Sequence, residues 1–412
     1  MDERTTARLF LPILAVLYML GFTNLFLRSS FGVMAPHLAA EMHLSPAALS
    51  AVASAFFFAY AAMQVPTGVL LDRFGARRTL ATMLLFTMVG AAVFSVARSG
   101  AMLAFGRILM GIGCAGVFTG AFYVLALWLP PARVVVSSGS LNSFAALGNL
   151  AATTPLAALI AWIGWRESYW IFTAGVLLLL TSIAVLVRDA PPGAPPRSSN
   201  RESFTEVIAG VRAAVRQPGI ARLLVAGFPM SAGSVITGVW GTPYLRDVHG
   251  LDDLGRGNVL LAMALSAIAG HLLCSRLARW LNSLRRAIIA GASGLVLTMG
   301  LMAIVAAPPL WLVIVLFCCT SLFGSYPTVT MAHARGLVPA NLMGRGVSVT
   351  NMGTMTAIAL MQFVFGWIVG MFPSEGGASP ESAYRAAFAV QAAVAILALL
   401  IYAPVPDVRP KG

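Results

Sequence analysis

The chain contains one long apolar segment after another, and each is long enough to cross a lipid bilayer as a helix. About 20 consecutive apolar residues span the hydrocarbon core. Only helices and closed barrels satisfy every backbone polar group in lipid, and these segments are too long and too little alternating for barrel strands. Only 10% of the 412 residues are charged, whereas about 25% is usual in soluble proteins. The sequence therefore predicts an all-α membrane protein with twelve transmembrane helices, at about residues 9–38, 47–70, 79–97, 102–129, 137–163, 168–187, 221–245, 257–275, 286–307, 310–334, 346–372 and 383–404.

The basic residues indicate membrane topology rather than a nucleic-acid surface. The two termini and the even-numbered connections hold 20 of the 27 Lys and Arg residues, and the odd-numbered connections hold five. Positively charged connections stay on the cytoplasmic side, so we expect both termini in the cytoplasm and no nucleic-acid partner despite the net charge of +13. A single Lys among the 27 basic residues is typical of a GC-rich bacterial genome, which favours a bacterial cytoplasmic (inner) membrane.

The chain divides into two halves that repeat. Prolines, serines and charges interrupt the apolar pattern after Asp189, and the amphipathic stretch among them predicts a cytoplasmic linker with a surface helix. Arg77 and Gly116 of the first half recur as Arg285 and Gly324, both at an offset of 208 residues. Parallel six-helix repeats form the two halves of one class of transporter. We expect an N-terminal six-helix bundle over 1–188, a linker over 189–220 and a C-terminal six-helix bundle over 221–412, related by a pseudo-two-fold axis.

Two motifs carry a resemblance to a known family. Residues 68–78 read G-x-x-x-D-R-x-G-x-R-R between the second and third spans, and residues 107–113 of the fourth span read R-x-x-x-G-x-G. Both resemble motifs of the major facilitator superfamily, and the chain looks like a member over its full length. The N-terminal half is most similar to the organophosphate antiporters and the anion:cation symporter type. The resemblance implies two six-helix halves that expose a central site alternately to the two sides of the membrane.

The loop motif predicts a gate on the cytoplasmic side. Gly75 permits a tight turn, and Gly68 is expected to let neighbouring backbones approach closely. Asp72 is expected to face the positive N-terminal dipole of a helix in the other half; the resemblance identifies that helix as the eleventh, near Gly346. The alternative is that the arginines only set the topology. The expected gating residues are Gly68, Asp72, Arg73, Gly75, Arg77 and Arg107, the last as a brace between the first and fourth helices.

Arg28 is the strongest candidate for a substrate contact. It lies inside the first span, where an arginine costs about 2.5–3.5 kcal/mol, and it shares a helix face with Asn24 and Gly32. All 14 carboxylates lie in connections or at helix ends, so an anionic substrate is the natural partner for this guanidinium. The alternative is that Arg28 snorkels or binds backbone carbonyls. The organophosphate antiporters carry a second arginine in helix seven, but here the repeat places Ile236 there, which favours a carboxylate over a phosphate ester.

His271 in the eighth span is a second ionisable candidate, as a proton acceptor or a donor to an anion; the alternative is an ordinary interhelical hydrogen bond. Because spans one, four, seven and ten line the cavity in the resembling family, other polar and aromatic residues are expected to contribute. The expected substrate-binding residues are Arg28, Asn24, Tyr60, Gln64, Tyr123, Trp240, His271 and Tyr326.

The sequence thus predicts a secondary transporter of a small organic anion, with protons as the candidate coupling partner, in a monomer embedded in membrane lipid. Alternatives are a carrier of amino acids or short peptides, an exporter of hydrophobic compounds, or a receptor that keeps the fold without transport. No catalytic residues, metal ligands or cofactors are expected. The grouping of His37, Glu41 and His43 is too exposed and loose to support a membrane enzyme.

Overall fold

The computed structural model describes residues 3–189, 204–339, 342–374 and 378–409. The N-terminal half comprises α1 (Glu3–Met42), α2 (Pro46–Ser95), α3 (Gly100–Ala115), α4 (Val117–Trp128), α5 (Pro131–Ala151), α6 (Thr154–Ile163) and α7 (Trp165–Leu186). A short helix, α8 (Phe204–Val215), follows. The C-terminal half comprises α9 (Ile220–Val225), α10 (Gly227–Val235), the π-helical turn η1 (Ile236–Trp240), α11 (Gly241–His249), α12 (Asp253–Trp280), α13 (Leu284–Ile304), α14 (Leu310–Phe323), α15 (Pro327–Leu337), α16 (Met343–Val369) and α17 (Glu381–Tyr402).

These helices make the twelve predicted spans. Ten helical stretches of the described chain are long and apolar enough to cross a membrane, and α5 with α6, bent by 42°, forms another. The 50-residue α2 is counted once, but Gly75 breaks it with a φ of +81° and a ψ of 169°. The two parts of α2 are therefore separate spans on either side of a tight turn, and the prediction of an all-α protein with twelve transmembrane helices is confirmed.

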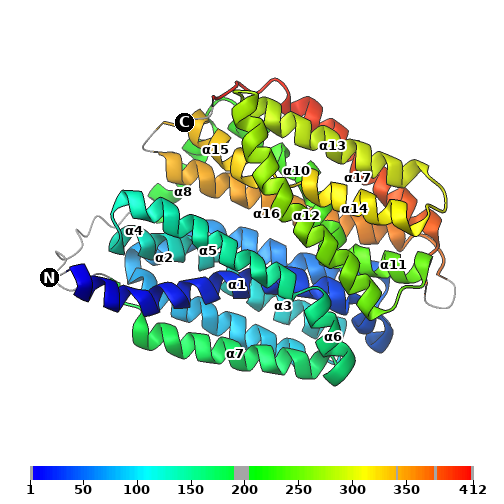
Figure 1. Cartoon of the computed structure of the whole chain (residues 1–412), viewed down its shortest axis with the longest axis horizontal. Helices are drawn as coiled ribbons and strands as arrows, with labels where there is room; N and C mark the ends of the chain where they lie inside the picture. Colours follow the sequence, from blue (N-terminus) through cyan, green and yellow to red (C-terminus); the bar gives the residue numbers. More distant parts are fainter. Residues whose placement is uncertain (1–2, 190–203, 340–341, 375–377, 410–412) are drawn as a thin grey trace.

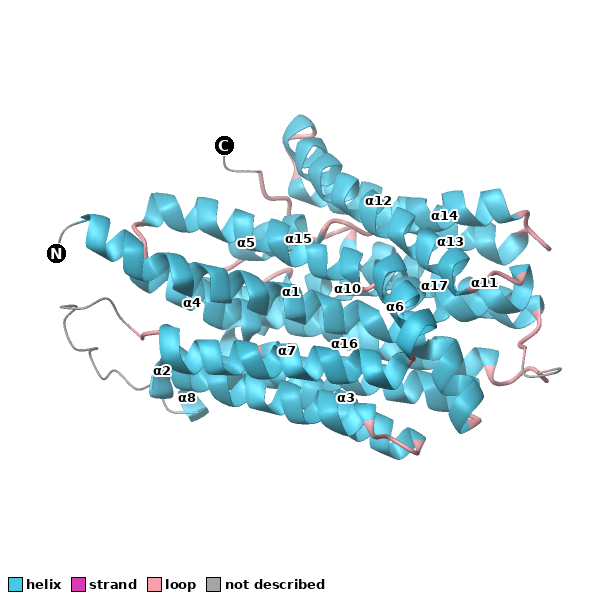
Figure 2. Cartoon of the chain, turned by 60° about the horizontal axis from the view of Figure 1, so that its bottom comes forward, coloured by secondary structure: helices cyan, strands magenta, loops and turns pink. Residues whose placement is uncertain are grey.

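The two halves lie side by side, with α1–α7 below and α9–α17 above in Figure 1. Both termini lie at the same end of the molecule, at the left of this view, where α8 also lies. Viewed from another side, α1 runs between the α5 side and the α7 side of its bundle (Figure 2), and α1 packs against both of these helices. The long spans run roughly parallel to one another, as expected for two transmembrane bundles.

The repeat is visible where each half turns from its second to its third span. The backbone N–H of Arg77 donates to Asp189 at 2.8 Å, and the backbone N–H of Arg285 donates to Asp407 at 3.1 Å. In each half, therefore, an aspartate beyond the last span caps the start of the third span. The two contacts support an internal repeat in three dimensions.

The halves touch closely at the end away from the termini. Trp240 donates from its indole N–H to the Ser50 hydroxyl at 3.1 Å, and Thr242 donates to the backbone carbonyl of Gly32. A methyl group at Gly32 would overlap the carbonyl oxygen of Thr237, so a glycine is required where α1 crosses η1. This end of the interface is closed.

The structure corrects one expectation for the loop motif. A Cβ atom at Gly68 would meet no atom within 4 Å. The close backbone approach expected at Gly68 is therefore not made in this conformation. At Gly75 the backbone turn itself requires glycine, because φ is +81°.

Candidate functional site

A cavity of about 340 Å³ lies between the two halves, near the middle of the bundle. Helices α1, α2 and α5 form its N-terminal wall, and α10, η1, α12, α14, α15 and α16 contribute to its C-terminal wall. The volume is within the range of about 300–1,000 Å³ that is usual for small-molecule sites. The cavity continues along α15 toward the end that carries the termini, since Met331 is among its lining residues.

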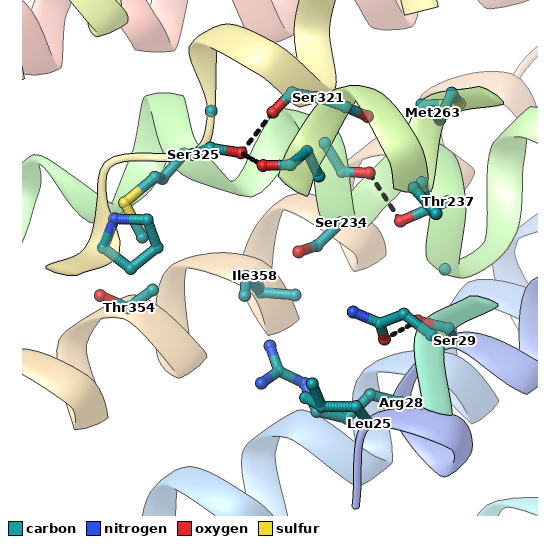
Figure 3. A pocket seen from close by; sticks show the side chains of 18 of the residues that line it. Leu25, Arg28, Ser29, Ser234, Thr237, Met263, Ser321, Ser325, Thr354 and Ile358 are labelled. Atoms are coloured by element: carbon teal, nitrogen blue, oxygen red, sulfur yellow. Dashed lines mark hydrogen bonds between the residues drawn. The ribbon is translucent and has the colours of Figure 1, made fainter. Parts of the chain in front are cut away.

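Arg28 enters this cavity from α1. Its guanidinium group points away from α1 and across the open space toward Ile358 and Ser234 of the other half (Figure 3). The carbon atom of the guanidinium lies 5.8 Å from the ring centroid of Phe57, which supplies a cation–π contact. Within the described residues, no carboxylate or other acceptor forms a hydrogen bond or ion pair with Arg28. The cation therefore faces the cavity without an anion from the described part of the chain.

Beside Arg28, Ser29 and Asn149 connect α1 to α5. The Ser29 hydroxyl donates to the side-chain oxygen of Asn149 at 2.9 Å (Figure 3). Both residues line the cavity. This bond uses the amide oxygen of Asn149 and leaves its NH₂ group for a ligand.

Hydroxyl groups are frequent on the C-terminal wall. Thr237 of η1, Ser325 between α14 and α15, and Thr354 of α16 all line the cavity (Figure 3). His271 of α12 also lines it, and its Nδ1 atom lies 2.7 Å from the backbone oxygen of Ala267. Within the described residues, Arg28 and His271 are the ionisable groups of the lining, with no Asp, Glu or Lys among them.

Three other predicted substrate-binding residues lie behind the wall. Asn24 donates to the backbone oxygen of Cys114 at 2.6 Å, which ties α1 to α3. Tyr60 is buried, with 3% of its surface exposed. Gln64 accepts a hydrogen bond at 2.9 Å from Asn351, which itself lines the cavity. These residues support the site from the N-terminal half without being among its lining residues.

The remaining aromatic candidates lie elsewhere in this conformation. Trp240 is stacked on Phe365 with ring centroids 5.5 Å apart, within the closed interface. Tyr326 is fully buried and donates to the backbone oxygen of Ala226 at 3.3 Å. Tyr123 packs against the core of the N-terminal half. None of these three rings is among the residues that line the cavity in the described part of the chain.

The predicted gating residues of the loop motif lie at the end that carries the termini. Asp72, Arg73 and Arg77 are exposed. The Arg73 guanidinium lies over the ring of Phe74 at 5.6 Å, and that of Arg77 donates to the backbone oxygen of Ala184. Arg77 therefore joins the motif to the sixth span of the same half.

Arg107 is buried, with 1% of its surface exposed. It donates to the backbone oxygen of Leu27 at 3.1 Å and lies 4.4 Å from the ring centroid of Phe56. The side chain thus connects α3 to α1 and α2, and it is not among the cavity-lining residues of the described chain.

Sequence reasoning missed several hydroxyl residues of the lining. Ser234 and Thr237 are separated by three positions on one face of the seventh span, and Ser29 follows Arg28 directly. The three-residue spacing on a helical face was an available signal. Single serines and threonines are too common in membrane helices for this signal to stand out. Among the described residues, no group of three or more His, Cys, Asp and Glu could hold a metal ion.

Comparison with known sequences identifies similar transporters. The family model described as Major Facilitator Superfamily matches residues 17–361. The chain is 30% identical over 186 residues to a probable sulfoacetate transporter of Cupriavidus necator, covering 45% of this chain and 43% of that protein. It is 29% identical over 204 residues to a probable galactarate/D-glucarate transporter of Escherichia coli, covering 47% of this chain and 44% of that protein. The matched region thus spans less than half the length of these curated relatives.

Solved structures share the fold. A nucleoside transporter mutant superposes with a TM-score of 0.76 at 12% identity, covering 94% of this chain and 98% of that one. A D-xylose-proton symporter gives a TM-score of 0.74 at 14% identity, covering 96% and 98%. At these identities the likeness concerns the arrangement of helices alone.

Proposed function

Because the chain belongs to the major facilitator superfamily, we propose that it is a secondary transporter of a small organic anion, which Arg28 binds in the central cavity. The observation that carries this proposal is the guanidinium of Arg28, which faces the cavity with no described protein acceptor. Burying an unpaired charge is unfavourable. A bound carboxylate would supply the missing negative charge in a bidentate geometry.

A carboxylate fits the cavity better than a phosphate ester. Arg28 is the single Arg or Lys among the described lining residues. Ile236 occupies the position that corresponds to Arg28 in the second half, where the organophosphate antiporters carry a second arginine. It is buried in η1. The two relatives, from Cupriavidus necator and Escherichia coli, are named for carboxylic acids, which supports an organic acid as the substrate class.

An amino-acid or peptide carrier is supported less well. A zwitterion would place its ammonium group in the cavity, and the described lining contains no Asp or Glu to pair with it. A buried ammonium group without an anion is costly.

We further propose alternating access between a bundle of residues 1–188 and a bundle of residues 221–412, joined by a linker of residues 189–220. Part of that linker, 190–203, lies outside the described residues. Contacts such as that of Trp240 with Ser50 hold the two halves together at the end away from the termini. They support a state in which the cavity is open toward the end that carries the termini. With both termini in the cytoplasm of a bacterial inner membrane, as the charge distribution predicts, this is an inward-facing state. Asp72 would act in the gate that closes it, and His271 would carry any coupled proton.

The test is uptake of radiolabelled D-gluconate, D-glucuronate and D-glucarate by proteoliposomes, with uncharged sorbitol as the negative probe. Arg28→Ala is expected to reduce uptake of the transported acid by roughly 10–150-fold, because a hydrogen bond to a charged group contributes about 1.5–3 kcal/mol. Arg28→Lys keeps the charge but loses the bidentate geometry, so partial activity is expected.

Arg98→Ala is the matched control, since Arg98 is an exposed arginine outside the cavity. Unchanged uptake by Arg28→Ala, with Arg98→Ala also normal, would contradict the anion-binding role of Arg28.

A further inference from the structure

The two walls of the cavity differ in hydrogen-bonding character. On the N-terminal wall, Arg28 offers N–H groups only. Asn149 uses its side-chain oxygen to accept from Ser29 and so presents its NH₂ group. This wall therefore presents the donors of Arg28 and Asn149 beside a positive charge. It also carries the acceptor oxygens of Ser29 and Thr153, whose protons are donated to Asn149 and to the backbone oxygen of Leu150.

On the C-terminal wall, most hydroxyl protons are already committed. Thr237 donates to the backbone oxygen of Gly233 at 2.9 Å, Thr354 to that of Thr350 at 3.1 Å, and Ser325 to that of Ser321 at 2.7 Å. A carbonyl oxygen can only accept, so the hydroxyl must be the donor in each pair. Each of these hydroxyls can offer a ligand only its lone pairs.

The same holds for most of the hydroxyl groups on this wall. Eight serines and threonines of the C-terminal half line the cavity, and six of them donate to a carbonyl of the preceding helical turn: Thr237, Thr320, Ser325, Thr330, Thr350 and Thr354. Ser234 and Ser321 have no such bond among the described contacts and can rotate to either role. The C-terminal wall as a whole therefore favours a ligand that donates hydrogen bonds.

Two larger side chains add acceptors. Asn351 donates one N–H to Gln64 at 2.9 Å, which leaves its side-chain oxygen as an acceptor for a ligand, together with its second N–H. His271 lies with Nδ1 at 2.7 Å from the carbonyl oxygen of Ala267, so Nδ1 carries a proton, and Nε2 can accept a hydrogen bond when it carries none. The C-terminal wall is therefore a surface of neutral acceptors.

We propose that the substrate is a hydroxylated monocarboxylate, held with its carboxylate on Arg28 and its hydroxyl groups donating to the C-terminal wall. This rests on the proposed function, because it assigns the anionic end to Arg28. A second carboxylate would face acceptors, with no second Arg or Lys in the described lining to neutralise it. An ammonium group would find acceptors but no described carboxylate. Hydroxyl groups need only neutral acceptors, and these are what the wall provides.

Four six-carbon acids test the proposal by calorimetric titration of the purified full-length protein. D-gluconate has one carboxylate and five hydroxyl groups, and hexanoate lacks the hydroxyl groups. D-glucarate has a second carboxylate, and D-glucosaminate has an ammonium group. D-gluconate is expected to bind at least about tenfold more tightly than each of the others, since a site built for hydroxyl groups rejects ligands that lack them.

A pair of variants on α16 distinguishes the loss of a substrate contact at the C-terminal wall from a general effect of the substitution on the protein. Thr354→Val removes a hydrogen-bond acceptor from the cavity. It is expected to weaken the binding of D-gluconate severalfold and to leave the binding of hexanoate unchanged. Thr356→Val is the matched control, because Thr356 also donates to its own helix, to Met352 at 2.9 Å, but is not among the lining residues. Equal losses for D-gluconate and hexanoate in Thr354→Val would overturn the assignment of the wall.

The outcomes for this inference and for the proposed function are distinct. If hexanoate or D-glucarate binds as tightly as D-gluconate, and Arg28→Ala abolishes the binding, the acceptor wall is refuted and the anion site stands. If D-glucosaminate binds most tightly, a zwitterion carrier replaces this inference. If none of the four acids shows Arg28-dependent binding, both proposals are overturned.

Discussion

His37 of α1 lies 3.2 Å from Asp253 of α12, measured from Nε2 to Oδ1, and so joins the two halves at the end away from the termini. Asp253 also forms an ion pair with Arg256 on its own helix. The side chains of His37 and Asp253 are partly exposed, at 34% and 27%. Under the proposed alternating access, this pair would have to separate when the cavity opens to the other side.

We therefore expect Asp253→Asn to favour opening at this end. A partly exposed pair contributes about 0.2–1 kcal/mol, so the open population should rise by up to roughly fivefold. Nitroxide labels at Val96 and Ile304, exposed positions at this end of the two halves, would report the change as a longer distance by electron–electron double resonance. Glu41→Gln is the control, since Glu41 pairs with Arg166 inside one half at the same end. An unchanged distance distribution in Asp253→Asn would rule out the gate role.

Gly75→Ala is expected to destabilise the protein, whereas Gly68→Ala is not. Gly75 has a φ of +81°, and a Cβ there would lie 2.6 Å from a carboxylate oxygen of Asp189. A positive φ combined with a ψ of 169° is a backbone conformation essentially restricted to glycine, and it costs another residue about 1–3 kcal/mol. A Cβ at Gly68 would meet nothing within 4 Å, and alanine favours a helix by about 0.8–1 kcal/mol. Melting temperatures in detergent compare the two variants. Equal melting temperatures would show that the turn does not depend on this glycine.

Asp407 is expected to add an acid-sensitive component to stability. Burial alone raises the pKa of Asp407, but hydrogen bonds from Ser283 and from the backbone of Arg285 and Val408, with the charge of Arg285, outweigh it and lower the pKa below its ordinary 3.8. A carboxyl group whose pKa is lower in the folded protein than in the unfolded chain stabilises the fold fully at pH values above its ordinary pKa. This stabilisation is lost as the pH falls through the folded-state pKa.

Asp407→Asn should therefore melt about 2 °C below the unmodified protein at neutral pH. The difference should begin to shrink below about pH 4 and be lost as the pH falls through the lowered pKa of Asp407. Differential scanning fluorimetry from pH 3 to 7 measures it. A difference that stays constant down to pH 3 would mean that the carboxylate charge is not involved.

Arg107 is expected to brace the N-terminal half without binding the substrate. It is buried against Phe56 and the carbonyl of Leu27, and it is not among the described residues that line the cavity. Arg107→Met removes a hydrogen bond made by a charged group, which contributes about 1.5–3 kcal/mol. Arg107→Met should therefore lower the melting temperature but leave the Kd for D-gluconate within about twofold, whereas Arg28→Met should weaken binding by at least about tenfold. Comparable losses in the two variants would place Arg107 in the binding site.

Part of the candidate site follows from the sequence because membrane insertion constrains each helix separately. An arginine inside a span is costly wherever the helix packs, and this cost identifies Arg28 as a candidate from the sequence alone. The same reasoning identifies His271, an isolated ionisable side chain in an apolar segment. Both line the cavity.

The aromatic candidates show where such reasoning fails. Trp240 and Tyr326 lie on the expected helices, yet Trp240 packs into the closed interface and Tyr326 turns toward Ala226. Which face of a helix meets the cavity depends on its rotation against its neighbours, and the π-helical turn at 236–240 changes that rotation locally. A helical periodicity in one segment does not contain this information.

By itself, the sequence determined the twelve helices, the two repeated halves and the lone cation within the first span, because bilayer thickness and the cost of burying charge act along the chain. Only the tertiary structure decided which hydroxyl groups share the cavity with Arg28 and which pairs, such as His37 and Asp253, close its far end. The reason is physical: these contacts join residues about 200 positions apart, and they form only through the packing of one half against the other.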